Sequence, residues 1–291
     1  MSIKKYRIYD CIPFFNELDI LELRLELLYD YVDYFVISEC DSTFSGENKP
    51  FYFDDNKEKY KKYSDKIIHL KHYKTKDYLI LENNYNGEKK IIYDKIINRL
   101  SFMIKSPKTD YGQPHWCRDF FHKELTMLGL DICKPDDIIL FGDCDEIPEP
   151  SKLIFDGDTY VLNQKNMMYY LNTENKTNSW YGTLIIKYSN LIDGSCMFTR
   201  DSRMSFKKID SAGWHLSWMG GKERMLQKLQ SWGHQEYNNQ YFKNQISSNF
   251  NSNTDILDRN IVIKSDDMKN IYPEKIVSFV ENKFPYLINI L

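Results

Sequence analysis

Apolar residues in the first part of the chain alternate between short continuous runs and a longer stretch with helical spacing. The short runs predict strands at Tyr6–Ile12, Tyr34–Ser38 and Lys66–Leu70. Between the first two runs, leucines recur every three or four residues, which predicts a helix from about Glu17 to Asp30. A strand, a helix and a second strand in succession open a βαβ unit, so the sequence favours an α/β protein with parallel strands.

The pattern changes after Pro150. Before it, helical spacing predicts a helix at Trp116–Leu130, whereas Tyr73–Pro114 is weakly periodic and predicts an irregular excursion or lid. Beyond it, short apolar runs separated by Asn, Gly and Ser predict an antiparallel section. Its strands are expected at Thr159–Asn163, Met167–Leu171, Leu184–Lys187 and Cys196–Thr199, and helices at Lys222–Gln230 and within Pro273–Leu291. The sequence has no repeat or clear linker, which predicts a single domain over residues 1–291.

The most distinctive stretch is an apolar run that ends in a group of carboxylates. Ile138–Phe141 is typical of a strand buried on both faces, and Asp143, Asp145 and Glu146 follow it. Two prolines just beyond are expected to stop the strand. Ligands of open α/β sheets bind at the carboxyl ends of strands, and oxygen ligands there suit Mg²⁺ or Mn²⁺ that also holds substrate phosphates. On these residues alone, an acidic turn that merely caps a strand is an equally good interpretation.

Composition narrows the class of protein. The 291 residues are 42% hydrophobic and 28% charged, which is ordinary for a soluble globular protein. A net charge of -3 gives no overall field that would attract nucleic acid, so no nucleic-acid partner is expected. The six cysteines form no C-x-x-C pair, which argues against a zinc site. The sequence shows neither a signal-peptide core nor an apolar run near the roughly 20 residues of a transmembrane segment, so we expect a reducing, cytoplasmic setting.

A set of ordered stretches then points to one family. The stretches are Pro13–Arg24, Val32–Glu39 with Thr43–Gly46 and Lys49-Pro50, Asp136–Ile139 with Asp143–Pro148, Ala212–Trp218, and Ser231–Gly233 with Glu236. Together, and in this order, they resemble glycosyltransferase family 17. That family contains the β-1,4-mannosyl-glycoprotein β-1,4-N-acetylglucosaminyltransferases, which add the bisecting GlcNAc to N-glycans. An ordered series of blocks is far more specific than the acidic motif alone.

The resemblance implies a fold and a reaction. The fold is of the GT-A type, in which a nucleotide-binding mixed sheet flanked by helices joins a partly antiparallel acceptor section. About residues 1–150 would bind the nucleotide sugar and about residues 151–291 the acceptor. The implied reaction is metal-dependent inverting transfer of a sugar, most simply GlcNAc from UDP-GlcNAc, to a glycan hydroxyl group. The implied cofactor is Mn²⁺ or Mg²⁺.

Particular residues take expected roles within this frame. Asp145 and Asp143 are the expected metal ligands. His215 is a third candidate ligand, with a satisfied core histidine as the alternative. The edge of the first two strands is expected to hold the nucleotide, with Arg118 either offsetting a phosphate or forming a structural ion pair. The expected donor-binding set is Phe14, Asn16, Glu17, Glu39, Ser42, Arg118 and Asp143.

Inversion also requires a general base on the acceptor hydroxyl group. Glu236 is the first candidate, because burial beside Trp232 would raise its pKa towards a useful value. A surface glutamate is the alternative interpretation, and His215 and His234 are the next candidates for the base. Two other classes of protein remain open at this point. A sugar-binding module on a degenerate transferase fold would use the aromatic residues, and a metal-dependent phosphohydrolase would use the same carboxylates without an acceptor.

Overall fold

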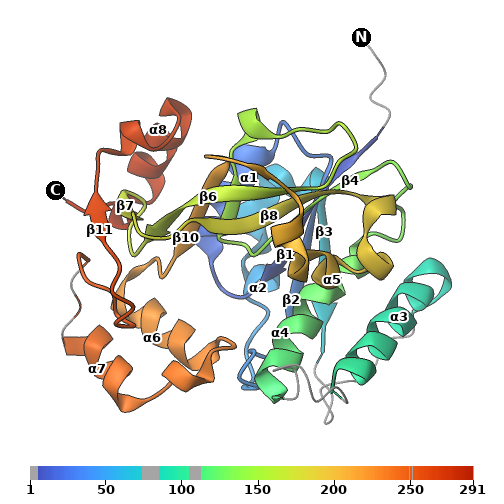
Figure 1. The fold of residues 1–291 in the computed structure, drawn as a ribbon, viewed down its shortest axis with the longest axis horizontal. Helices are drawn as coiled ribbons and strands as arrows, with labels where there is room; N and C mark the ends of the chain where they lie inside the picture. The colour runs from blue at the N-terminus through green and yellow to red at the C-terminus, as the bar shows by residue number, and fades with distance from the viewer. Residues whose placement is uncertain (1–5, 74–84, 105–112, 249, 251, 291) are drawn as a thin grey trace.

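A computed structural model describes residues 6–73, 85–104, 113–248, 250 and 252–290. These residues form a mixed sheet flanked by helices, which confirms the predicted α/β class (Figure 1). The strands are β1 (Ile8–Phe14), β2 (Tyr34–Cys40), β3 (Ile67–His72), β4 (Ile138–Phe141), β5 (Glu146–Pro148), β6 (Tyr160–Met168), β7 (Thr173–Asn175), β8 (Trp180–Lys187), β9 (Lys207–Ile209), β10 (Gly213–Ser217) and β11 (Ile263–Ser265). The α-helices are α1 (Leu18–Leu28), α2 (Tyr52–Asn56), α3 (Gly87–Ile104), α4 (Pro114–Glu124), α5 (Cys196–Asp201), α6 (Gly221–Ser231), α7 (Gln240–Ser248) and α8 (Glu274–Lys283).

The sheet has a parallel part and an antiparallel part. Its main path runs β11-β7-β6-β8-β4-β1-β2-β3, with β4, β1, β2 and β3 parallel to one another. Strand β8 pairs antiparallel with both β4 and β6, so the sheet continues without a break across residue 150. Off this path, β10 lies between β5 and β6. The change from parallel to antiparallel strands predicted after Pro150 is therefore confirmed.

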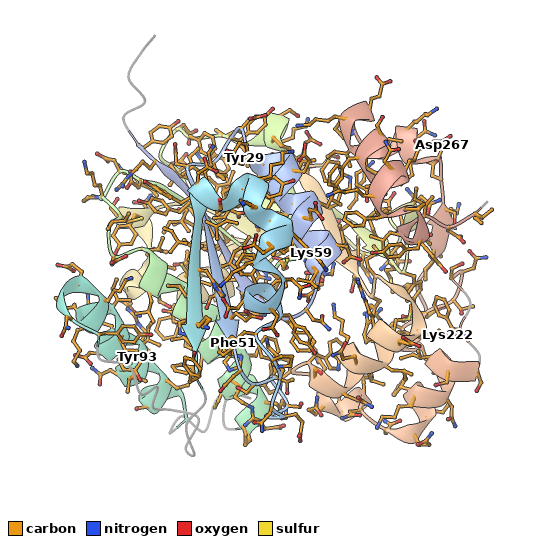
Figure 2. The ribbon with its side chains drawn as sticks, turned by 180° about the vertical axis from the view of Figure 1, so that it is seen from behind. Tyr29, Phe51, Lys59, Tyr93, Lys222 and Asp267 are labelled. Carbon is orange, nitrogen blue, oxygen red and sulfur yellow. The ribbon has the colours of Figure 1, made fainter. Side chains whose placement is uncertain are left out.

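Side chains alternate across the parallel strands and supply two apolar clusters. Along β1, Ile8 and Ile12 lie in one cluster, and Tyr9 and Cys11 lie in the other. Helices α1 and α8 complete the first cluster, and α3 and α4 complete the second. Viewed from behind, Tyr29 at the end of α1 and Lys59 lie on the near side of the sheet (Figure 2). With both faces covered, the polar ends of the strands are the natural place for a ligand.

Four sequence predictions need correction. Within Tyr73–Pro114, part of which lies outside the described residues, α3 is a regular helix whose Ile92, Ile96 and Leu100 recur every four residues and are buried. Residues 196–199, expected as a strand, begin α5, because the Ser195 side chain accepts the backbone N–H of Phe198 and starts a helix. The two strands expected at 159–163 and 167–171 are one strand, β6. The prolines were expected to end strand structure, but strand β5 follows the acidic turn and contains Pro148. A proline is tolerated there because β5 pairs on one side only.

Candidate functional site

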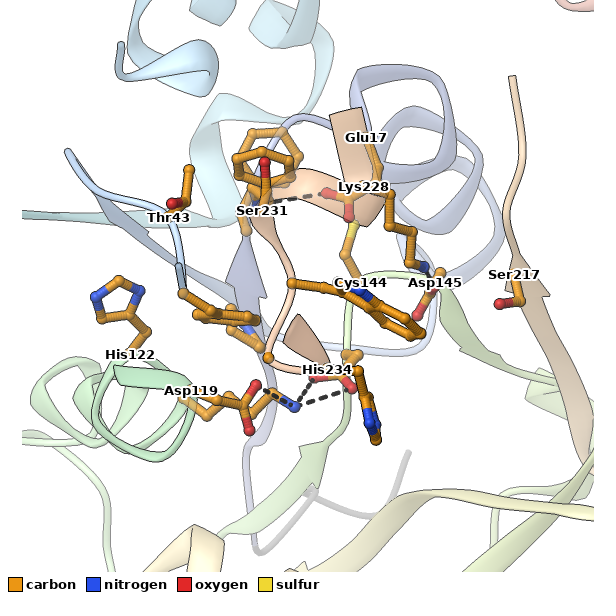
Figure 3. Close-up of a pocket in the computed structure, with 18 of the residues that line it drawn as sticks. Glu17, Thr43, Asp119, His122, Cys144, Asp145, Ser217, Lys228, Ser231 and His234 are labelled. Atoms are coloured by element: carbon orange, nitrogen blue, oxygen red, sulfur yellow. Dashed lines mark hydrogen bonds and ion pairs between the residues drawn. The ribbon is translucent and has the colours of Figure 1, made fainter. Parts of the chain in front are cut away.

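A pocket of about 770 Å³ opens at the carboxyl ends of β1, β2 and β4, and residues of α4 and α6 line it. Its walls carry charged, aromatic and imidazole side chains from both halves of the chain (Figure 3). The lining includes Phe14, Glu17, Ser42, Lys49, Trp116, Asp119, Lys123, Asp143, Asp145, Trp180, Arg200, His215, Lys228, Trp232 and His234. Such a mixture of cations and carboxylates suits a ligand that carries both phosphates and a metal ion.

Arg24 of α1 holds the acidic turn of this pocket, residues 143–146, against the sheet. The Arg24 guanidinium is fully buried and pairs with Asp10 of β1, with an Nη2–Oδ1 distance of 2.7 Å. Its Nη1 donates to the carbonyl oxygens of Asp143 and Glu146, at 2.9 Å each. A guanidinium group has five N–H donors and no acceptor, so Arg24 can donate hydrogen bonds to several carbonyl oxygens at once. The sequence from Asp143 to Glu146 is therefore fixed to the sheet by a residue of the first helix.

Asp143 faces two cations. Lys123 Nζ lies 3.2 Å from its Oδ1, and Arg200 Nη2 lies 3.3 Å from its Oδ2. Burial alone would raise the pKa of the Asp143 carboxyl, but Lys123 and Arg200 outweigh burial and hold the pKa well below its usual range. Lys123 also pairs with Asp119 at 3.1 Å. Asp143 is thus an ionised carboxylate whose charge is already balanced by protein side chains.

Glu146 connects the acidic turn to the opposite wall. Its fully buried carboxylate accepts two hydrogen bonds from Arg200, at 2.6 and 2.8 Å, and one from Trp180 Nε1 at 2.9 Å. It also accepts the backbone N–H of Asp143 at 3.0 Å. A buried carboxylate with four donors is well satisfied, so Glu146 is a structural hub and not a free ligand.

Asp145 and His215 face each other on the other side of the turn. Asp145 Oδ2 lies 3.3 Å from Lys228 Nζ and 3.8 Å from His215 Nε2. His215 Nδ1 lies 3.1 Å from the amide oxygen of Asn166, which only accepts hydrogen bonds, so Nδ1 carries the proton. The ring is stacked on Trp180 with 3.8 Å between centroids. Burial lowers the pKa of His215, which keeps the ring neutral with the Nε2 lone pair directed towards Asp145.

This arrangement fits a divalent cation. The carboxylate of Asp145 and the bare Nε2 of His215 are both acceptors, and two acceptors that face each other at close range are stabilised by a cation between them. Among the described residues, no group of three or more His, Cys, Asp or Glu side chains converges to hold a metal ion without help. Substrate phosphates and water would supply the remaining ligands, as is usual for Mg²⁺.

The expected donor-binding residues divide into two groups. Phe14, Glu17, Ser42 and Asp143 line the pocket, whereas Asn16, Glu39 and Arg118 are not among its lining residues. Asn16 donates from its amide to Gln227 of α6 at 2.7 Å. The remaining two, Glu39 and Arg118, support the pocket from outside.

Glu39 and Arg118 each fix a different part of the wall. The Glu39 carboxylate is fully buried, accepts the backbone N–H of Phe53 at 3.0 Å, and lies 3.4 Å from Lys49 Nζ. Lys49 in turn lines the pocket. Arg118 donates to the carbonyl oxygens of Phe44 and Ser45, at 2.6 and 2.8 Å, and so holds the loop after β2. Both residues therefore act on the pocket through their neighbours.

The prediction that Glu236 is buried beside Trp232 is wrong. Its side chain is 57% exposed and does not line the pocket. Burial favours a raised pKa, but the hydrogen bond from His234 outweighs burial and lowers the pKa of Glu236 below its usual value. The aromatic residues around it pack against each other and against α4 instead of covering the carboxylate.

Six cations of the pocket were not among the expected site residues: Lys49, Lys123, Arg200, Arg203, Lys228 and Arg259. One sequence signal was available for Lys123. Trp116, Asp119 and Lys123 follow helical spacing, so they share one face of α4. No such signal pointed to Arg200, because the apolar residues before it predicted a strand and not a helix with a polar face.

Comparison with known proteins agrees with the sequence resemblance. The family model of glycosyltransferase family 17 matches residues 1–100, which include β1, α1, β2 and Lys49. No curated protein and no solved structure matches the chain. Within the described ranges, every helix is too short or too polar to cross a membrane. The match favours a glycosyltransferase, a class of enzyme that uses a sugar donor and an acceptor. This match covers about a third of the chain and is a similarity to glycosyltransferase family 17.

Proposed function

We propose that this protein transfers GlcNAc from UDP-GlcNAc to a glycan hydroxyl group, with inversion at the anomeric carbon and with Mn²⁺ or Mg²⁺ as cofactor. The observation that carries the proposal is the pairing of Asp145 with neutral His215 in a pocket, lined by six cations, at the ends of the parallel strands. As part of this proposal, the sheet is of the GT-A type, and about residues 1–150 would hold the donor and about residues 151–291 the acceptor. The β-1,4 linkage follows from the family and belongs to the same proposal.

The chain's own side chains divide the work of binding a diphosphate. Asp145 and His215 would hold the metal ion, which supplies Lewis-acid stabilisation of the leaving diphosphate. Lys123 and Arg200 fix Asp143 and place positive charge beside it. Lys49 and Lys228 add cations on the side of β1 and β2. Because these groups are held before the ligand arrives, they stabilise developing negative charge without reorganisation.

The function is tested first by binding and then by turnover. Calorimetry should show that UDP binds in the presence of Mn²⁺ and much more weakly in its absence. Release of UDP from UDP-GlcNAc should then increase when glycans that end in mannose are supplied as acceptors. Equal UDP release with and without acceptor would instead indicate a phosphohydrolase. Glycan binding without any nucleotide binding would indicate a sugar-binding module.

Glu39 should affect nucleotide binding through its neighbour Lys49. Glu39→Gln keeps the shape and the hydrogen bond to Phe53 but removes the charge beside Lys49. Burial already lowers the pKa of Lys49, and Glu39 opposes that effect. In the variant the pKa of Lys49 falls further, so its charge is lost at a lower pH. UDP affinity measured by calorimetry should fall roughly tenfold, equivalent to about 1.4 kcal/mol, and more steeply as pH rises.

The metal site provides the control for this variant. Mn²⁺ affinity without nucleotide should not change, because Glu39 does not line the pocket. Unchanged UDP affinity across the pH range would show that Lys49 does not contact the nucleotide.

A further inference from the structure

The loop after α6 crosses the pocket and is fixed at both sides. The carbonyl oxygen of Ser231 accepts the backbone N–H of Ser45, at 3.2 Å, which ties the loop to the segment after β2. Gly233 lies flat against Trp116 of α4, where an added Cβ would stand 3.0 Å from a ring carbon. His234, the next residue, is therefore held in the pocket wall by backbone contacts on either side (Figure 3).

His234 forms a dyad with Glu236. His234 Nδ1 lies 2.7 Å from Glu236 Oε1, and an ionised carboxylate can only accept, so Nδ1 is the donor. With Nδ1 as the donor, Nε2 is the ring nitrogen that can accept a proton from a ligand. His234 lines the pocket and Glu236 does not, so the imidazole is the member of the dyad that a ligand can reach.

The surroundings of His234 suit a sugar. Its ring lies 4.7 Å, centroid to centroid, from both Trp116 and Trp232. Among the described residues, the buried Nε1–H of Trp232 has no hydrogen-bond partner. Trp232 and Trp116 both line the pocket, and aromatic faces beside polar groups are typical of sites that bind a polar molecule with apolar faces.

Helix α4 contacts both His234 and the acidic turn. Trp116 contacts His234, and Lys123, on the same helix face, contacts Asp143. Seven helical positions separate Trp116 from Lys123, which corresponds to about 10 Å along the helix. The dyad and the acidic turn therefore contact α4 at points about 10 Å apart along its axis.

We propose that His234 is the general base of the transfer and that Glu236 is a positioning residue that acts through it. The proposal rests on the proposed glycosyl transfer. The acceptor oxygen forms a bond to the anomeric carbon as the bond to the diphosphate breaks, and the diphosphate leaves with the electron pair. The acceptor proton passes to Nε2 of His234, and the resulting imidazolium is stabilised by Glu236 until it releases the proton to water.

Glu236 and Tyr237 face the imidazole from its own loop. Removal of the Glu236 charge takes away the group that would stabilise the imidazolium, so turnover should fall while His234 still lines the pocket.

The test uses slow hydrolysis of UDP-GlcNAc in Mn²⁺, with water in place of the unknown acceptor. His234→Ala should lower kcat by roughly 10²–10⁴ while UDP binding remains as in the wild type. Glu236→Gln should cause a smaller loss of kcat with UDP binding unchanged, and it should add little to the loss caused by His234→Ala. His115→Ala removes a neighbouring imidazole outside the pocket and should leave kcat and UDP binding unchanged.

Two outcomes would overturn the assignment, and a third concerns the function itself. If His234→Ala keeps its kcat, or if Glu236→Gln abolishes turnover more completely than His234→Ala, the imidazole is not the base. A wild-type protein that binds UDP with Mn²⁺ separates that failure from failure of the proposed function. If the wild type neither binds UDP nor releases it from UDP-GlcNAc, the proposed transfer is wrong and the role of His234 fails with it.

Discussion

Asp145→Asn is expected to abolish the metal-dependent binding of UDP. Asparagine keeps the shape of the side chain but removes the charge that faces His215 Nε2 at 3.8 Å. Loss of a residue that merely supports a metal ligand costs about 10–100-fold in metal affinity, so loss of a ligand charge should cost more than about 100-fold. Calorimetric titration with UDP in Mn²⁺ measures the effect directly.

The fold should tolerate this change. Lys228, the other partner of Asp145, has a side chain that is 30% exposed and keeps Glu17 nearby, so its charge does not become isolated. The loss of stability should be smaller than the roughly 3–5 kcal/mol that is typical when a fully buried ion pair is broken. Asp136→Asn is the matched control, since Asp136 precedes the same strand, is 72% exposed and pairs with Lys187 away from the pocket. A variant at Asp145 that binds UDP with wild-type, Mn²⁺-dependent affinity would rule out Asp145 as a ligand.

The sequence was a good guide wherever local pattern decides structure. The apolar runs before the polar loops predicted β1, β2, β3 and β4, and the spacing of leucines predicted α1. These segments are buried on two faces or along one stripe, and burial of that kind leaves a periodic signal. By contrast, the α5 segment has an apolar composition that fits a strand equally well, and the capping hydrogen bond of Ser195 decides in favour of a helix.

The candidate site was predictable only in part for a related reason. Asp143 and Asp145 follow a strand directly, so their place at the sheet edge can be inferred from local sequence. Their cationic partners come from far along the chain: Arg200 is 57 residues from Asp143, and Lys228 is 83 residues from Asp145. Pairings over such distances depend on the completed fold. The prediction that Glu236 is buried failed for a different reason. A sequence that places aromatic residues beside a carboxylate does not show whether they cover the carboxylate or pack elsewhere.

Arg24→Met should cause the largest loss of stability of any change considered for this protein. Arg24 and Asp10 are both fully buried, so the variant leaves the Asp10 charge without a partner in the core. Removal of one member of a buried ion pair typically costs about 3–5 kcal/mol. The carbonyl oxygens of Asp143 and Glu146 also lose their donor, so the acidic turn should loosen and UDP binding in Mn²⁺ should weaken. Denaturant unfolding followed by circular dichroism measures the first effect.

A second substitution distinguishes an isolated charge from lost packing. Asp10→Leu combined with Arg24→Met removes both charges, and it should recover much of the stability lost in Arg24→Met while UDP binding stays weak, because the carbonyls of the acidic turn still lack their donor. Lys62→Met provides an exposed comparison, since Lys62 pairs with Glu26 but is 64% exposed and should cost no more than about 1 kcal/mol. If Arg24→Met costs no more than Lys62→Met, the buried pair does not anchor the acidic turn to the sheet.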